Sequence, residues 1–264
     1  MPQVLRALLP HSPLLIDEIG KENKVILKKT ENAYQLVAKE LKEKQVETII
    51  VISQHGEILD DSFSIGIAPE FNVNFSEFAC FKKRTSLKND LLLSDKLLET
   101  INHEFPLTPR PIAKLDHGSA IPLELLTKEN KDIKVLPLYC ANNLDWKTHY
   151  QFGLRLKEFI DQQTKKIAII ASGDLSHRLK VSSPGGFSPK AVKFDNKIMQ
   201  YLSEPENASD KLLNLNPKSV NEAKESVLKP LLVLLGIIGS DYKTKKLAYQ
   251  DDFGVGYLSV LFNK

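Results

Sequence analysis

Short apolar runs alternate with longer amphipathic segments along the chain. Five runs are rich in β-branched residues and lack polar alternation: residues 4–9, 47–53, 133–139, 166–172 and 256–262. This pattern predicts strands that are covered on both faces. Amphipathic helices are expected between them, at residues 22–44, 91–103, 147–163, 188–202 and 219–238. Residues 62–88 lack helical periodicity, which indicates a hairpin-like excursion or an edge pairing.

The alternation of strands and helices predicts an α/β fold, a three-layer α/β/α sandwich with a mostly parallel central sheet. No repeat, low-complexity linker or convincing boundary divides the 264 residues, so we expect a single catalytic domain over residues 1–264. With 42% apolar and 26% charged residues, the composition is that of an ordinary globular protein. The net charge is +3, from 36 basic and 33 acidic residues. The lysine-rich stretches mix with glutamate or lie beside polar turns, which indicates solvated surface rather than nucleic-acid binding.

The two cysteines, Cys80 and Cys140, lie far apart and outside any CxxC spacing. A disulfide framework is therefore not indicated, and a reducing cytoplasm is the expected location. The start of the chain shows no basic-then-apolar leader, and no apolar stretch approaches the roughly 20 residues that a membrane span needs. We therefore expect no membrane partner.

Four of the six histidines, His11, His55, His117 and His177, follow a strand-like run or a turn motif. Ligands of open α/β sheets bind just beyond the carboxyl ends of the strands, so these imidazoles are expected to converge. Histidine is both the commonest metal ligand and the usual acid or base near neutral pH. Taken alone, His11 is more typical of a surface turn, and His55 is equally compatible with a ligand and a turn residue. His103 and His149 occur in polar helical surroundings and are expected at the surface.

Two acidic residues next to these histidines have open roles. Asp116 precedes His117 and either orients a histidine or bonds backbone amides, whereas Asp174 caps or pins the loop before His177. The carboxylate of an iron site is sought in residues 219–226. Glu222 lies three residues after Ser219, as in a capping box. Glu225 lies on an apolar helix face near Pro230, where a carboxylate is costly unless it is paired or binds a cation.

An ordered set of short motifs covers nearly the whole chain. These are PHSPLL, QHG, DHGSAIPL, SGDLSHRL, FSPKAVKFDNKIMQYL, ESVLKPLLVLLG and GVGYLSVLF. In this order the chain resembles the class III extradiol ring-cleavage dioxygenases, specifically the catalytic B-subunit family, in the branch associated with AMMECR1-type and radical-SAM proteins. Two departures are SQHG, where the family commonly has Pro before His, and ESV, where many relatives have Glu-Cys-Gly.

The resemblance implies cleavage of a catecholic aromatic ring with Fe(II) and O2. It implies a metal held by His11, His55 and Glu225, with Glu222 as the fallback, and His177 as acid/base. His117 would be a further active-site histidine. Zinc at the same ligands would instead suit a hydrolase, and the Memo-like relatives suggest a metal-binding or interaction protein without catalysis.

The sequence leaves the substrate and the oligomeric state open, including a homo-oligomer or a small partner subunit. The pocket walls are expected from residues 62–88, 178–189 and 240–253, and the loop over residues 178–189 is expected to cover the pocket. Arg178 or Lys180 would anchor an acidic aromatic substrate.

Overall fold

The computed structural model describes residues 3–56, 58–82, 85–101 and 103–263. A central sheet of eight strands has the order β6-β3-β7-β2-β8-β1-β10-β9. Its strands are β1 (Gln3–Leu9), β2 (Thr48–Ser53), β3 (Phe63–Gly66), β6 (Leu107–Arg110), β7 (Lys134–Tyr139), β8 (Ile167–Ser172), β9 (Lys243–Gln250) and β10 (Tyr257–Asn263). A separate antiparallel pair, β4 (Glu70–Asn72) and β5 (Ser86–Lys88), lies in the segment expected to be hairpin-like.

The centre of the sheet is parallel, since β7, β2, β8 and β1 pair in that order with parallel registers. Antiparallel pairs flank it, β3 with β7 on one side and β10 with β1 and β9 on the other. The edge strand β9 contains a lysine-rich segment, and its exposed residues are Lys243, Lys245 and Lys246.

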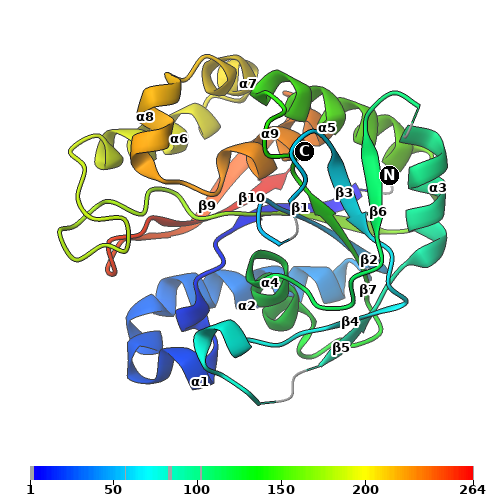
Figure 1. Ribbon diagram of the computed structural model, residues 1–264, viewed down its shortest axis with the longest axis horizontal. Coiled ribbons are helices and arrows are strands. Elements are labelled where there is room, and N and C mark those ends of the chain that lie inside the picture. The colour runs from blue at the N-terminus through cyan, green and yellow to red at the C-terminus, as the bar shows by residue number, and fades with distance from the viewer. Residues whose placement is uncertain (1–2, 57, 83–84, 102, 264) are drawn as a thin grey trace.

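Helices cover both faces of the sheet (Figure 1), as the three-layer prediction requires. One layer contains α2 (Lys28–Glu43) and α4 (His117–Thr127), with the short α1 (Asp17–Gly20) beside them. The other contains α3 (Leu91–Ile101), α5 (Trp146–Asp161), α6 (Ala191–Leu202), α7 (Pro205–Leu213), α8 (Pro217–Ala223) and α9 (Leu228–Ile238). Within the described residues, no helix is long and apolar enough to cross a membrane.

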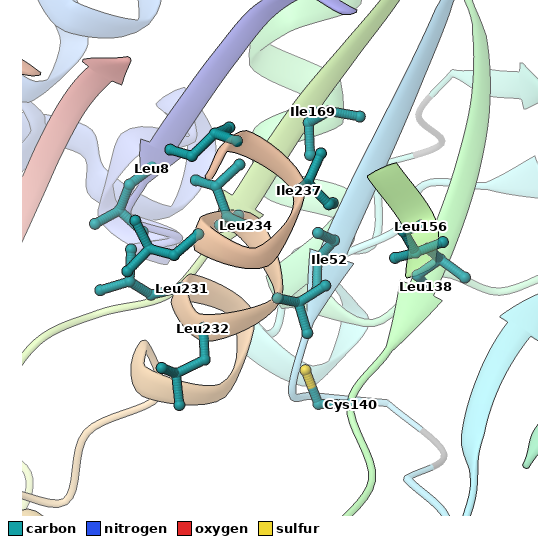
Figure 2. Close-up of a cluster of buried hydrophobic side chains, with 14 of the residues drawn as sticks. Leu8, Ile52, Leu138, Cys140, Leu156, Ile169, Leu231, Leu232, Leu234 and Ile237 are labelled. Atoms are coloured by element: carbon teal, nitrogen blue, oxygen red, sulfur yellow. The ribbon is translucent and has the colours of Figure 1, made fainter. Parts of the chain in front are cut away.

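Each central strand contributes side chains to two hydrophobic clusters, one on each face of the sheet. In β2, Ile50 and Ile52 pack with the α5–α9 layer, whereas Ile49 and Val51 pack with the α2–α4 layer. Such alternation buries every side chain of the strand, which explains the unbroken apolar runs. Figure 2 shows α9 seated on the sheet through Leu231, Leu234 and Ile237, which lie beside Leu8, Ile52 and Ile169.

The segment expected as one helix over residues 219–238 forms two helices. α8 ends at Ala223, Lys224 takes a left-handed conformation (φ 52°), and α9 begins at Leu228. Pro230 therefore lies in the first turn of α9, where its missing amide leaves no helical hydrogen bond unmade. The interruption places residues 224–227 at the carboxyl edge of the sheet, beside Asp174.

Candidate metal centre

Three adjacent parallel strands end at one place. β1 ends at Leu9 and leads to His11, β2 ends at Ser53 and leads to His55, and β8 lies between them and ends at Ser172. The residue after Ser172 is Gly173, so the middle strand carries only small side chains at its end. This leaves room for the two imidazoles to meet across β8.

The imidazoles of His11, His55 and His117 form a compact cluster. The Nε2 atoms of His11 and His55 are 3.1 Å apart. The ring centroids of His55 and His117 are 4.4 Å apart, and those of His11 and His117 are 5.4 Å apart. One ligand atom from each of the three lies within 4.8 Å of the others. Three nitrogen donors at this separation surround a space suited to one transition-metal ion.

Neighbouring hydroxyls fix the orientation of His11. Its Nδ1 lies 3.0 Å from Oγ of Ser172, and that hydroxyl donates its own proton to the carbonyl of Gly118. Ser172 can therefore only accept from His11, which places the imidazole proton on Nδ1 and leaves the lone pair on Nε2. That lone pair points at His55, in the manner of metal-binding histidines held by a second hydrogen bond.

His117 is the first residue of α4 and is held by the cap of that helix. Asp116 is the N-cap, and its Oδ1 accepts from the amide of Ser119 and from the hydroxyl of Ser53, each at 3.0 Å. Asp116 thus bonds backbone rather than a histidine. A Cβ on Gly118 would lie 2.5 Å from Oγ of Ser53, so glycine allows α4 to approach the end of β2. The Nδ1 of His117 lies 3.4 Å from Oε2 of Glu77.

His177 reaches the same region through Asp174. The Nε2 atoms of His177 and His11 each lie 3.8 Å from Oδ2 of Asp174. The other carboxylate oxygen accepts from the amide of His11 at 2.9 Å, so Asp174 pins the loop after β1. About a quarter of the His177 side chain (27%) is accessible, whereas Asp174 is buried. His177 is therefore the more accessible of the two imidazoles that face this carboxylate.

Glu225 lies in the interruption between α8 and α9, outside the three-histidine cluster. Its Oε2 accepts from the amides of Val227 and Leu228, at 2.6 and 2.7 Å, and so caps α9. Two contacts link this segment to the histidines. Oγ of Ser226 lies 3.4 Å from Nε2 of His11, and the side chain of Gln54, the residue before His55, donates to the Glu225 carbonyl. The carboxylate thus borders the cluster without joining it.

The capping-box interpretation of Ser219 and Glu222 is wrong. The N-cap of α8 is Asn216, whose side chain accepts from the amides of Lys218 and Ser219. Glu222 instead pairs with Lys190 at 2.7 Å, away from the histidines. The earlier Asn-Pro pair starts the helix because Pro217 suits its first position.

Burial shapes the electrostatics of the cluster. It holds the pKa of His11 well below its ordinary value, and the nearby His117 and His177 lower it further. Burial, with His11 and His117, lowers the pKa of His55 to about 3. Both imidazoles are therefore neutral near pH 7, the form that binds metals. Burial also raises the pKa values of Asp174 and Glu225, because their charged forms lose contact with water there.

A cavity of about 340 Å³ opens beside the cluster. It is lined by His55 and His117 and by residues that include Glu77, Arg110, Lys114 and Tyr139. Of the expected walls, only residues 62–88 contribute. Arg178 and Lys180 do not line this cavity: Arg178 donates to the carbonyls of Glu222 and Phe187, and Lys180 to that of Asp252.

Two further outcomes concern histidines and orienting residues. The expectation that His149 is at the surface is wrong: it is fully buried, with Nδ1 2.7 Å from the carbonyl of Asp145 and its ring against Phe63. His103 is exposed, as expected. Ser172 and Glu77, which contact cluster histidines, were not singled out. A small polar residue at the end of a buried strand could have pointed to Ser172 as a histidine contact. No local sequence pattern points to Glu77.

The fold and the cluster define an α/β protein with a histidine-rich centre at the carboxyl edge of a parallel sheet. The sequence model of the family described as the catalytic LigB subunit of aromatic ring-opening dioxygenase matches residues 5–260. The chain belongs to this family, and the predicted resemblance is confirmed at that level.

Relatives agree with this assignment. Protein CA_C1420 of Clostridium acetobutylicum is 29% identical over 261 residues, which cover 95% of this chain and 55% of the relative. The chain thus spans about half the length of that protein. The 3,4-dihydroxyphenylacetate 2,3-dioxygenase of Escherichia coli is 22% identical over 253 residues, 90% of each chain. The crystal structure of uncharacterized protein JW3007 from Escherichia coli K12 has the same fold, with TM-score 0.71, 18% identity and coverage of 98% and 99%.

Proposed function

We propose that the protein is a metal-dependent extradiol dioxygenase that opens a catecholic ring with iron(II) and dioxygen. The observation that carries the proposal is the meeting of His11 and His55, from β1 and β2, beside a cavity in a chain of the ring-opening dioxygenase family. Their nitrogen donors are neutral and oriented, so the residues present fit a divalent transition metal.

His11 and His55 are two of the proposed ligands, and Glu225 is the third. Support for Glu225 comes from its neighbours. The Ser226 hydroxyl lies 3.4 Å from Nε2 of His11, and Gln54, the residue before His55, donates to the Glu225 carbonyl. A partly buried carboxylate also gains from a nearby cation. The helix amides use Oε2, which leaves Oε1 for a metal. The rival third ligand is His117, because it already lies within the cluster.

Bound iron(II) would supply Lewis acidity and open positions for the diol and dioxygen. His177 would accept a proton from a diol hydroxyl at Nε2, the atom on the side of Asp174 and His11, and later return it. His117, which lines the cavity, would hydrogen-bond a substrate oxygen. The proposed substrate is therefore a small aromatic diol bound in the cavity beside His55 and His117.

The test is dioxygen uptake by protein purified anaerobically and loaded with iron(II), with a panel of catechols. We expect about one iron per chain, dioxygen uptake and a yellow ring-opened product. The His177→Ala variant should keep the iron but lose the dioxygen uptake and the product. Iron binding without dioxygen uptake across the panel would contradict the proposal.

One observation favours a second candidate, a zinc hydrolase at the same centre. Three imidazoles within 4.8 Å match the three-histidine sets that hold catalytic zinc with one open position. In that case His177 would relay a proton from bound water. Tight binding of zinc in preference to iron(II), with hydrolysis of ester or amide substrates and no oxygen uptake, would select this candidate.

A further inference from the structure

Asp195 is a buried carboxylate that the proposed mechanism does not use. It belongs to α6 and lies within the motif FSPKAVKFDNKIMQYL, on the face that also buries Phe194 and Ile198. A carboxylate at such a position costs more than an apolar residue of similar size unless its oxygens are satisfied. Packing of α6 alone therefore does not account for Asp195.

Both oxygens of Asp195 have specific donors. Oδ1 accepts from the amide of Ser176 at 2.9 Å, and Oδ2 accepts from the hydroxyl of Tyr249 on β9 at 2.8 Å. The Ser176 amide is one peptide away from His177. A hydrogen bond from the carboxylate thus restrains the backbone that carries His177.

The surrounding backbone is built to admit this carboxylate. A Cβ on Gly256 would lie 2.1 Å from Oδ2 of Asp195, so any larger residue there would displace it. The Gly256 amide donates to the Ser176 carbonyl at 2.9 Å, and the Leu175 amide donates to the Gly256 carbonyl at 2.8 Å. The segment before His177 is therefore held against the start of β10 as well as against α6.

The far side of the same segment is tied to the α8–α9 interruption. The Ser176 hydroxyl and the His177 amide both donate to the carbonyl of Ala223, at 3.0 and 2.9 Å. With α6 on one side and Ala223 on the other, the peptide between Ser176 and His177 has little freedom to rotate. The direction of the His177 side chain, toward Asp174, depends on that peptide.

We propose that Asp195 is a positioning residue that acts through the Ser176 amide to aim the His177 imidazole at the metal centre. Tyr249 assists by holding the second carboxylate oxygen. This inference rests on the proposed function for the role of His177, but the restraint itself is a property of the fold. Asp195 is predicted to touch neither substrate nor metal.

The kinetic test compares Asp195→Ala and Asp195→Asn with wild type in the full, iron-loaded chain. Asp195→Ala removes the acceptor, and we expect kcat to fall about tenfold to a hundredfold with KM and iron content nearly unchanged, since small misplacements of a catalytic group have effects of this size. Asp195→Asn keeps one oxygen for Ser176 and should restore much of the rate. Ile198→Val, on the same buried face, controls for loosening of α6 and should leave kcat unchanged.

Two comparisons separate positioning from a general structural effect. On a His177→Ala background, Asp195→Ala should lower the residual rate no further, because Asp195 acts through the His177 imidazole that is already absent. An equal loss on that background would overturn the proposal. If Asp195→Ala does not fold, Tyr249→Phe removes one of the two donors and should give a smaller loss in the same direction.

A readout without activity keeps this test independent of the proposed function. Nitrogen-labelled histidine side chains of the metal-free full chain would be followed by NMR at pH 8. The His177 ring signals, assigned with His177→Ala, should shift or broaden in Asp195→Ala, while those of His149 in α5 stay in place. Unmoved His177 signals would overturn the inference, whether or not the wild type consumes dioxygen. If the His177 signals shift in a protein that takes up no dioxygen, the positioning role of Asp195 is supported and the proposed dioxygenase function is contradicted.

Discussion

The Nδ1 of His11 lies 3.0 Å from the hydroxyl of Ser172, and that hydroxyl donates onward to the carbonyl of Gly118. The relay joins the end of β1, the end of β8 and the start of α4. It fixes the imidazole plane and keeps the Nε2 lone pair directed at His55. Without the hydroxyl, His11 could adopt the other tautomer and turn away from the cluster.

Ser172→Ala is therefore expected to weaken metal binding about tenfold to a hundredfold, the usual effect of removing a partner that orients a ligand. The measurement is a competition titration of iron(II) or zinc with a chromogenic chelator. Ser259→Ala is the matched control, because Ser259 is a buried strand residue whose hydroxyl has no partner among the described residues. Equal affinities for wild type and Ser172→Ala would show that the relay does not orient His11.

The third ligand can be decided by two substitutions at the centre. Glu225→Gln keeps an oxygen for the Val227 and Leu228 amides but removes the charge, so α9 should remain capped. We expect it to lower metal affinity at least tenfold, with a smaller effect for His117→Ala. The same chelator titration and the metal content after dialysis provide the measurement. The reverse order would assign the third position to His117.

The strands that carry the site were predictable because their signal is local. Uninterrupted β-branched runs predicted β2, β7 and β8 closely, and their parallel arrangement implied that His11 and His55 would approach each other. The break between α8 and α9 was less visible. Residues 219–223 and 228–238 are both helical, and a four-residue break that begins at the left-handed Lys224 separates them.

Long-range contacts explain what the sequence did not reveal. The burial of His149 depends on Phe63, which is 86 positions earlier in the chain and has a ring centroid 5.0 Å from that of His149. The contact between Glu77 and His117 likewise joins an exposed turn to a helix start. In each pair the two residues are far apart in the sequence, so no local pattern predicts the contact. The polar residues next to His149 in the sequence therefore suggested a surface position for it.

Stability should depend on pH through the buried His149. Burial lowers its pKa to about 4, whereas an unfolded histidine has a pKa near 6.5. Below pH 6.5 the His149 side chain binds a proton in the unfolded chain but not in the folded chain. The free energy of unfolding therefore falls as the pH falls from about 6.5 to about 4. The loss from this residue is ~2 kcal/mol at pH 5.

The measurement is the free energy of unfolding of the metal-free protein in urea at pH 7.5 and pH 5, for wild type and His149→Gln. Glutamine does not titrate, so the variant should lose less stability on acidification than wild type. His103→Gln, at an exposed position, should behave as wild type. An identical pH dependence in wild type and His149→Gln would contradict the burial effect.

Gly236 and Gly153 let α9 and α5 pack unusually close together. A Cβ on Gly236 would lie 2.3 Å from the Tyr150 carbonyl oxygen, and one on Gly153 would lie 2.2 Å from that of Val233. Helix propensity alone favours alanine over glycine by about 1 kcal/mol. Overpacking against rigid backbone costs ~1–3 kcal/mol, and both helices would have to separate.

We therefore expect Gly236→Ala to lower the free energy of unfolding by up to ~2 kcal/mol, the net of these two effects. Because α9 begins beside Glu225 and Ser226, its displacement should also weaken metal binding more than the stability loss alone explains. Urea unfolding and the chelator titration measure the two effects on the same protein. A Gly236→Ala protein more stable than wild type would mean that α9 moves away from α5 at little cost, and that its position does not set the geometry of the centre.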